Sequence, residues 1–96
     1  MLPWHVRFTV HGVPIESVDS VRYAAALSFA RSVSTPERRF PQLERLQQQD
    51  VEIDGPALIQ ELDTLARLAP AEGLAAVLGN IRDDVLKGLA IAAGRG

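Results

Sequence analysis

The first pattern along the chain is an alternation of apolar and polar residues over positions 4–10, WHVRFTV. This period is typical of a half-buried β-strand, whose side chains point alternately to the two faces of a sheet. The pair His11-Gly12 follows, and glycine suits the second position of a two-residue hairpin turn because that turn requires positive φ. The apolar face of the strand would be formed by Trp4, Val6, Phe8 and Val10.

A turn at His11-Gly12 fixes the register between this strand and the segment VPIE. The first pairs beside the turn are then apolar and share one face, while a charge pair lies on the other face, as expected of a stable hairpin. Pro14 has no backbone N–H, so its strand has to lie at an edge of the sheet or at the end of the pairing. The predicted pairs are Val10 with Val13, Phe8 with Ile15 and Arg7 with Glu16.

A first helix is predicted to begin after Ser17 or Asp19, either of which can act as N-cap, and to end near Val33. A second helical segment would have Thr35 as N-cap and Pro36 in its first position, with Pro41 interrupting it. We therefore expect a short or broken helix there. Its anchors in the core would be Phe40, Leu43 and Leu46.

Two helices with clear apolar stripes are predicted in the second half, after a brief extended segment through Val51 and Ile53. Asp54 caps the first, over residues 55–69, and the last covers residues 71–94. Because their connection is short, we expect them to be antiparallel. Pairs of opposite charge four residues apart would stabilise their outer faces. These pairs are Asp63 with Arg67 and Asp83 with Lys87.

The predicted elements form one α+β domain over residues 1–96. An N-terminal strand or β-hairpin packs on about four helices that end in an antiparallel helix pair. A chain of 96 residues has the length of one common domain, and its hydrophobic fraction of 47% is that of a globular protein.

Two of the predicted helices are apolar on more than one side, and one small domain has few layers with which to cover both. On the first helix, a second stripe lies opposite the stripe that contains Val21 and Phe29. On the last helix, small residues lie opposite the stripe that faces the core. We predict a partner-binding surface formed by Tyr23, Leu27 and Ala30, or by Ala75, Gly79, Leu86 and Ala90.

The residue inventory limits the chemistry. The chain has no cysteine, which excludes disulfides, a thiol nucleophile and cysteine-based metal sites. His5 and His11 are six residues apart on one strand, and at ~3.3 Å per residue they lie about 20 Å apart, too far to share a zinc ion. We expect both to be solvated, and we expect no metal site and no cofactor.

Charge is nearly balanced, with a formal net charge of −2. Acidic residues interrupt the one basic cluster, so we do not expect nucleic acid as the main partner. A dimeric ribbon-type DNA-binding protein is the first alternative, with His5, Arg7 and Thr9 exposed on the strand. A small enzyme that uses His5 or His11 is the second. The basic cluster is Arg31, Arg38, Arg39 and Arg45.

The function that these patterns favour is non-catalytic protein–protein interaction. We predict an adaptor, an immunity- or inhibitor-type protein, or a subunit of a homodimer, acting in the bacterial cytoplasm. The most apolar carboxy-terminal stretch is interrupted by Lys87 and is shorter than the ~20 residues that span a bilayer. The amino terminus has no basic segment followed by a long apolar run, so we expect neither a signal peptide nor a membrane association.

Overall fold

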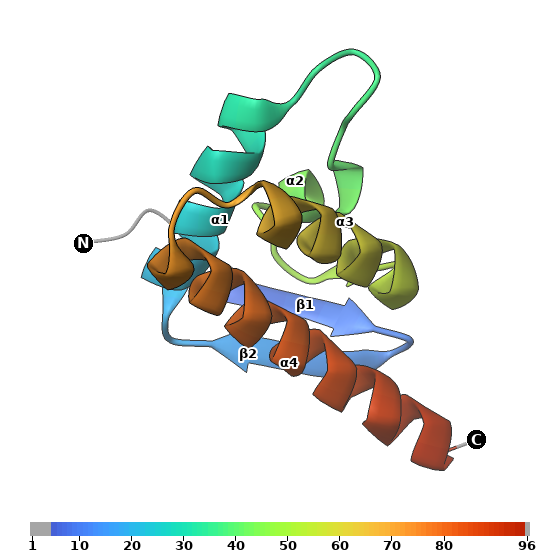
Figure 1. The fold of residues 1–96 in the computed structure, drawn as a ribbon. Helices are drawn as coiled ribbons and strands as arrows, with labels where there is room; N and C mark the ends of the chain where they lie inside the picture. The colour runs from blue at the N-terminus through green and yellow to red at the C-terminus, as the bar shows by residue number, and fades with distance from the viewer. Residues whose placement is uncertain (1–4, 96) are drawn as a thin grey trace.

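The computed structural model describes residues 5–95 as a small sheet with helices packed on one of its faces (Figure 1). This arrangement is the α+β class that the sequence predicts. In chain order the elements are β1 (Val6–Val10), β2 (Val13–Ser17), α1 (Ser20–Val33), α2 (Pro41–Arg45), β3 (Val51–Ile53), α3 (Gly55–Leu68) and α4 (Glu72–Arg95).

The sheet has the strand order β2-β1-β3. β1 and β2 form the predicted antiparallel hairpin, with all three predicted pairs in register. His11 and Gly12 both have positive φ, 49° and 80°, which is the backbone of a type I′ turn. β3 adds to the other side of β1 in parallel, with Val10 opposite Ile53. Trp4, predicted on the apolar face of β1, lies outside the described residues.

The capping residues determine where α1 and α3 begin. The Asp19 side chain accepts a hydrogen bond from the backbone N–H of Arg22, and the Asp54 side chain accepts one from that of Ala57. Both prevent an unpaired donor in the first turn, as predicted. Residues 51–53 form the predicted extended segment, now identified as β3.

The predicted start of the second helix at Thr35 and Pro36 is wrong. Thr35 and Arg38 exchange two backbone hydrogen bonds, so residues 35–38 form a tight turn. A helix that began at Pro36 would end before Pro41 and would be too short to be stable. The helix begins instead at Pro41. At the first position of a helix the backbone N–H has no partner within the helix, so its absence from proline costs no hydrogen bond. The predicted anchors, Phe40, Leu43 and Leu46, are buried.

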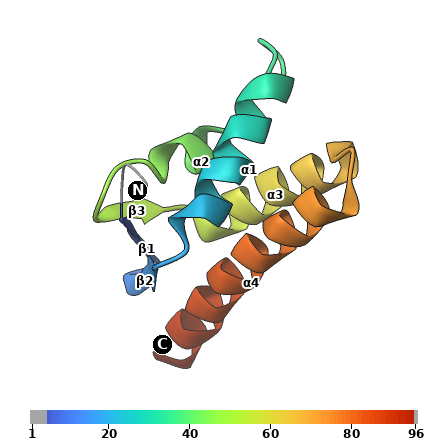
Figure 2. The same cartoon turned by 90° about the vertical axis from the view of Figure 1, so that its left-hand side faces the viewer.

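The core lies between the sheet and the helices. α3 and α4 form the predicted antiparallel pair, and α4 crosses β1 and β2 on one face of the sheet (Figures 1 and 2). Gly88 allows this close approach: a Cβ atom there would lie 2.8 Å from Ile15 Cδ1. The rings of Phe8 and Tyr23 meet edge to face at 6.3 Å and join β1 to α1.

Candidate protein-interaction surface

The predicted binding stripe on α1 is buried. Tyr23, Leu27 and Ala30 are exposed by 1%, 5% and 1%, and they belong to the hydrophobic core. The prediction that these three residues form a partner surface is therefore wrong for the folded chain. Both stripes of α1 are apolar, and the one with Tyr23 and Leu27 faces inward, where the Tyr23 ring packs on Phe8.

The opposite side of α1 is the side left in solvent. Val18, directly before the helix, is 96% exposed and Val21 is 61% exposed. Ala25 is also exposed, and Phe29, four residues further along the same side, is half-buried. The apolar side chains that the fold does not cover on α1 are thus those of the stripe opposite the predicted partner surface.

A shallow groove of about 410 Å³ runs beside this stripe, between α1 and α4. We call the residues that line the groove, together with the exposed Val18, the α1/α4 surface. Its apolar part is Val18, Val21, Ala25 and Val77, and its polar part is Asp19, Arg22 and Asn80.

The two charged side chains of the α1/α4 surface bind each other. Arg22 Nε lies 3.3 Å from Asp19 Oδ2, and Asp19 Oδ1 accepts the backbone N–H of Arg22 over 3.2 Å. Asp19 thereby caps α1 and holds the Arg22 guanidinium at the rim of the groove. The formal charges of this pair cancel.

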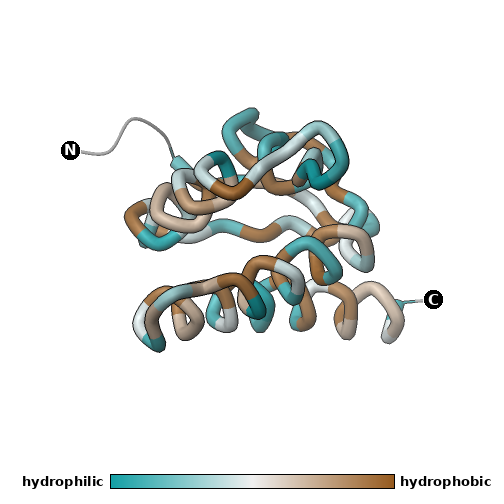
Figure 3. Tube along the Cα trace, turned by 45° about the horizontal axis from the view of Figure 1, so that its top comes forward, coloured by the Kyte–Doolittle hydropathy of each residue, from teal (hydrophilic) through white to brown (hydrophobic). Residues whose placement is uncertain are grey.

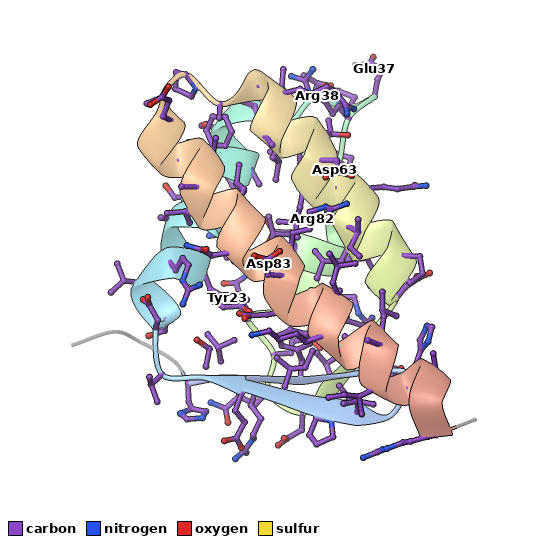
Figure 4. All side chains as sticks on the ribbon, turned by 60° about the horizontal axis from the view of Figure 1, so that its bottom comes forward. Tyr23, Glu37, Arg38, Asp63, Arg82 and Asp83 are labelled. Carbon is purple, nitrogen blue, oxygen red and sulfur yellow. The ribbon has the colours of Figure 1, made fainter. Side chains whose placement is uncertain are left out.

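Tyr23 and Asp84 connect the inner sides of the same two helices. The Tyr23 hydroxyl donates a hydrogen bond of 2.8 Å to the Asp84 carboxylate, and Tyr23 lies close to α4 in Figure 4. Burial raises the pKa of Tyr23, and the hydrogen bond to Asp84 raises it further, so the hydroxyl stays protonated. A tyrosine within an apolar stripe signals a buried hydroxyl that requires a partner, but the sequence does not indicate which acid supplies it.

The predicted stripe on α4 is divided between two environments. Ala75 and Gly79 are half-buried, whereas Leu86 and Ala90 are exposed. Arg82, within the same stripe, points toward α3 and binds Asp63 with a Nε–Oδ1 distance of 3.0 Å (Figure 4). The first half of the stripe therefore follows the junction with α3, and the second half extends toward the apolar last turns of α4 (Figure 3). Binding through Leu86 and Ala90 stays a prediction.

The ion pair of Asp63 differs from the predicted one. The sequence spacing favours Arg67 as its partner, but Asp63 binds Arg82 of α4. Arg67 contacts the Thr64 hydroxyl instead, over 3.3 Å. The pair therefore links α3 to α4.

The two histidines lie at opposite ends of β1, as predicted, and both are exposed. His5 Nε2 is 3.9 Å from a Glu16 carboxylate oxygen. His11 is at the hairpin turn, where Glu52 accepts hydrogen bonds from the Gly12 N–H and the Thr9 hydroxyl. Within residues 5–95, histidine and carboxylate side chains do not gather in a group that could hold a metal ion.

The arginines of the basic cluster are engaged with local partners. Arg31 binds Glu44 through two hydrogen bonds and holds the pKa of that carboxyl below its usual range. Arg38 donates to the Val33 carbonyl and Arg45 to the Glu52 carbonyl. Three of these guanidiniums thus bind three different local partners, and Arg39 lies near Glu44 as well.

The outer face of the sheet is acidic, which does not favour the DNA-binding alternative. Arg7 binds Asp50 with a Nε–Oδ1 distance of 2.7 Å, and the neighbouring Glu16 and Glu52 are also exposed. A duplex that approached this ribbon would bring its phosphates against three carboxylates.

Both edges of the sheet are protected against an added strand. Pairs alternate along an antiparallel ladder, and with Val10 and Val13 hydrogen-bonded, Pro14 and Thr9 form a non-hydrogen-bonded pair. The Pro14 nitrogen, which has no hydrogen to donate, therefore faces away from β1, and no hydrogen bond of the hairpin is lost. On the other side, the Arg45 guanidinium occupies the Glu52 carbonyl of β3 over 3.0 Å. These features disfavour recognition by strand addition and leave the helix faces.

The arrangement defines a small α+β protein with a one-sided sheet and with apolar side chains exposed along α1. Comparison of the chain with protein-family models, curated protein sequences and solved structures gives no match. Within the described residues, no helix combines the length and the apolar character needed to cross a membrane.

Proposed function

We propose that this chain is a non-catalytic protein-interaction protein of the cytoplasm, and that it binds a protein partner through the α1/α4 surface. The exposure of two neighbouring valines, Val18 and Val21, beside the groove between α1 and α4 carries this proposal. An adaptor, an immunity- or inhibitor-type protein and a subunit of a homodimer all fit such a surface.

The outward residues of α1 differ from those expected of a helix that only faces water. Val18, Val21, Ala25, Ser28 and Ser32 lie on this side and are uncharged. Complete burial of a valine is worth ~1.5–3 kcal/mol relative to its exposed state. Folding of the chain does not bury these two valines, so their burial against a partner would stabilise a complex.

A site-specific crosslinking experiment tests the proposal. A photoreactive amino acid would replace Val21 in one variant and Gln60, exposed on α3, in a matched control. In cells that express the protein, we expect covalent adducts from position 21. The yield of adducts from position 60 should be at least about tenfold lower, because that position lies outside the proposed interface. Absence of adducts at position 21 would contradict the proposal.

The carboxy-terminal end of α4 is the second candidate surface. Leu86 is 38% exposed, and Ala90, four residues further along the same side of the helix, is also exposed. A third variant with the photoreactive group at position 86 separates the two sites. Adducts at position 86 without adducts at position 21 would transfer the binding function to this end of α4.

A further inference from the structure

We infer that the occupant of the α1/α4 surface is the same surface of a second copy of this chain, in a two-fold symmetric dimer. This inference rests on the proposed function, because it names the partner of that same site. It follows from the charge of the surface, from the order of side chains along α1, and from the area available.

The charge of the α1/α4 surface suits self-association. In a two-fold interface the same patch lies on both sides, so any net charge would face its own copy. Asp19 and Arg22 cancel within the surface, and Val18, Val21, Ala25 and Asn80 are uncharged. The outer sheet face is different, since Glu16, Asp50 and Glu52 outnumber the single arginine there.

The distribution of polar groups along α1 avoids like-charge contacts in an antiparallel pair. A two-fold axis near the middle of the helix places the first turn of one copy beside the last turns of the other. The first turn carries the Asp19–Arg22 pair, whereas the outward side of the last turns presents the hydroxyls of Ser28 and Ser32. Arg31, the basic residue of the last turn, is paired with Glu44. Each Asp19–Arg22 pair thus meets neutral hydroxyls, both of which can accept from a guanidinium, although the Ser32 hydroxyl already donates to the Phe29 carbonyl.

The middle of α1 is where the two helices can approach each other. Ala25 is the outward residue near the midpoint of α1, and Val21 and Phe29 lie one turn to either side of it. A small side chain at the crossing point allows interaxial distances near the lower end of the ~8–10 Å range, with the flanking larger side chains in contact.

The available area predicts a reversible dimer. The 14 residues of α1 extend over about 21 Å at ~1.5 Å per residue. The patch includes the adjacent part of α4 and is therefore two helix diameters wide, at ~10 Å each, so its footprint is about 400 Å² per copy. That is about half of the ~800 Å² per partner in a standard stable interface. We therefore expect a dissociation constant in the micromolar range or weaker.

The absence of cysteine from the sequence permits a sharp test. A residue beside the two-fold axis lies against its own copy, within the ~4.4–6.8 Å between Cα atoms that a disulfide requires. Under mild oxidation, Ala25→Cys should form a covalent dimer at least about tenfold faster than Gln60→Cys, whose thiol would be exposed away from the interface. The unmodified chain should show an average mass that rises above 10.4 kDa with concentration in sedimentation equilibrium, and Val21→Asp should reduce that rise.

Three outcomes decide between this inference and the proposed function. Faster oxidation of Ala25→Cys together with concentration-dependent association supports the dimer. The dimer is overturned if the chain stays monomeric up to about 1 mM, since a dissociation constant above that concentration is too weak for a specific interface, and if the two cysteine variants oxidise at equal rates. If the crosslinker at position 21 then captures a different protein, the proposed function stands without the dimer, and if it captures nothing, both fail.

Discussion

The Tyr23 hydroxyl on α1 donates a hydrogen bond to the Asp84 carboxylate on α4, with 2.8 Å between the two oxygen atoms. The outer sides of these two helices form the groove of the α1/α4 surface. The bond lies inside the same pair of helices and fixes their relative position from the core side. The shape of the exposed groove therefore depends on a buried polar contact.

Replacement of Tyr23 by phenylalanine is the direct test of this contact. A hydrogen bond to a charged group contributes ~1.5–3 kcal/mol, and because Asp84 is half-exposed and can bind water instead, we expect Tyr23→Phe to cost about 1–2 kcal/mol. Asp84→Asn retains an acceptor and should cost less. Urea unfolding measures both, and equal midpoints for Tyr23→Phe and the parent chain would show that the bond contributes nothing.

Substitutions at the two residues of the hairpin turn should change the stability of the fold in opposite directions. His11 has φ 49° although it is not glycine, and asparagine adopts this conformation more readily. We expect His11→Asn to stabilise the fold by a few tenths of a kcal/mol, up to about 1 kcal/mol. Gly12 has φ 80°, so Gly12→Ala should cost ~1–2 kcal/mol. Thermal unfolding of the two variants tests this, and a loss of stability in His11→Asn would indicate that the imidazole has a role of its own.

Two glycines at helical positions should respond in opposite ways to replacement by alanine. Gly79 has open space around a built Cβ atom, so Gly79→Ala should stabilise α4 by ~0.5–1 kcal/mol. At Gly55 the added atom would lie 2.8 Å from Val10 Cγ1 and 2.9 Å from Leu89 Cδ2, both inside the core. Gly55→Ala should therefore cost ~1–3 kcal/mol. Denaturant unfolding compares the two, and stabilisation by both changes would show that the packing at Gly55 is loose.

Local patterns predict the hairpin and the two capped helices because their information lies within a few residues. The register of Val10 with Val13 follows from the turn alone, and Asp19 and Asp54 each precede a recognisable helix. The parallel pairing of β3 with β1 joins residues more than 40 positions apart. No periodicity in either segment specifies such a partner.

The side of α1 that the sequence predicts to be exposed is the wrong one, and the reason is physical. Val21 and Tyr23 belong to two stripes that are both apolar, so periodicity alone does not determine which one is buried. Side-chain volume does not determine it either, because each stripe contains one large aromatic residue, Tyr23 in the buried stripe and Phe29 in the opposite one. The predicted partner surface is on the side of α1 that is buried, whereas the exposed Val21 and Ala25 lie on its other side.

Glu61 on α3 connects two helices that the sequence analysis treated separately. Its carboxylate accepts the backbone N–H groups of Gln42 over 3.1 Å and of Leu43 over 3.0 Å. These are among the first donors of α2, and Phe40 at the N-cap position of that helix provides no side-chain acceptor. Glu61 therefore caps α2 from a neighbouring helix.

The pH dependence of stability tests the environment of Glu61. Burial raises the pKa of Glu61, and the Asp54 carboxylate adds to the rise, while the two N–H groups of α2 oppose it. Since the pKa in the folded state is above that in the unfolded state, this group stabilises the fold at low pH, and the contribution is lost as the pH rises through the folded pKa. Glu61→Gln does not titrate, so the stability of the parent chain minus that of Glu61→Gln should fall with increasing pH across the acid range. Urea unfolding of both proteins at a series of pH values measures this difference, with Gln60→Ala as a control whose difference from the parent chain stays constant. A parent chain that instead gains stability relative to Glu61→Gln as the pH rises would show that the hydrogen bonds from α2 outweigh the burial of the carboxylate.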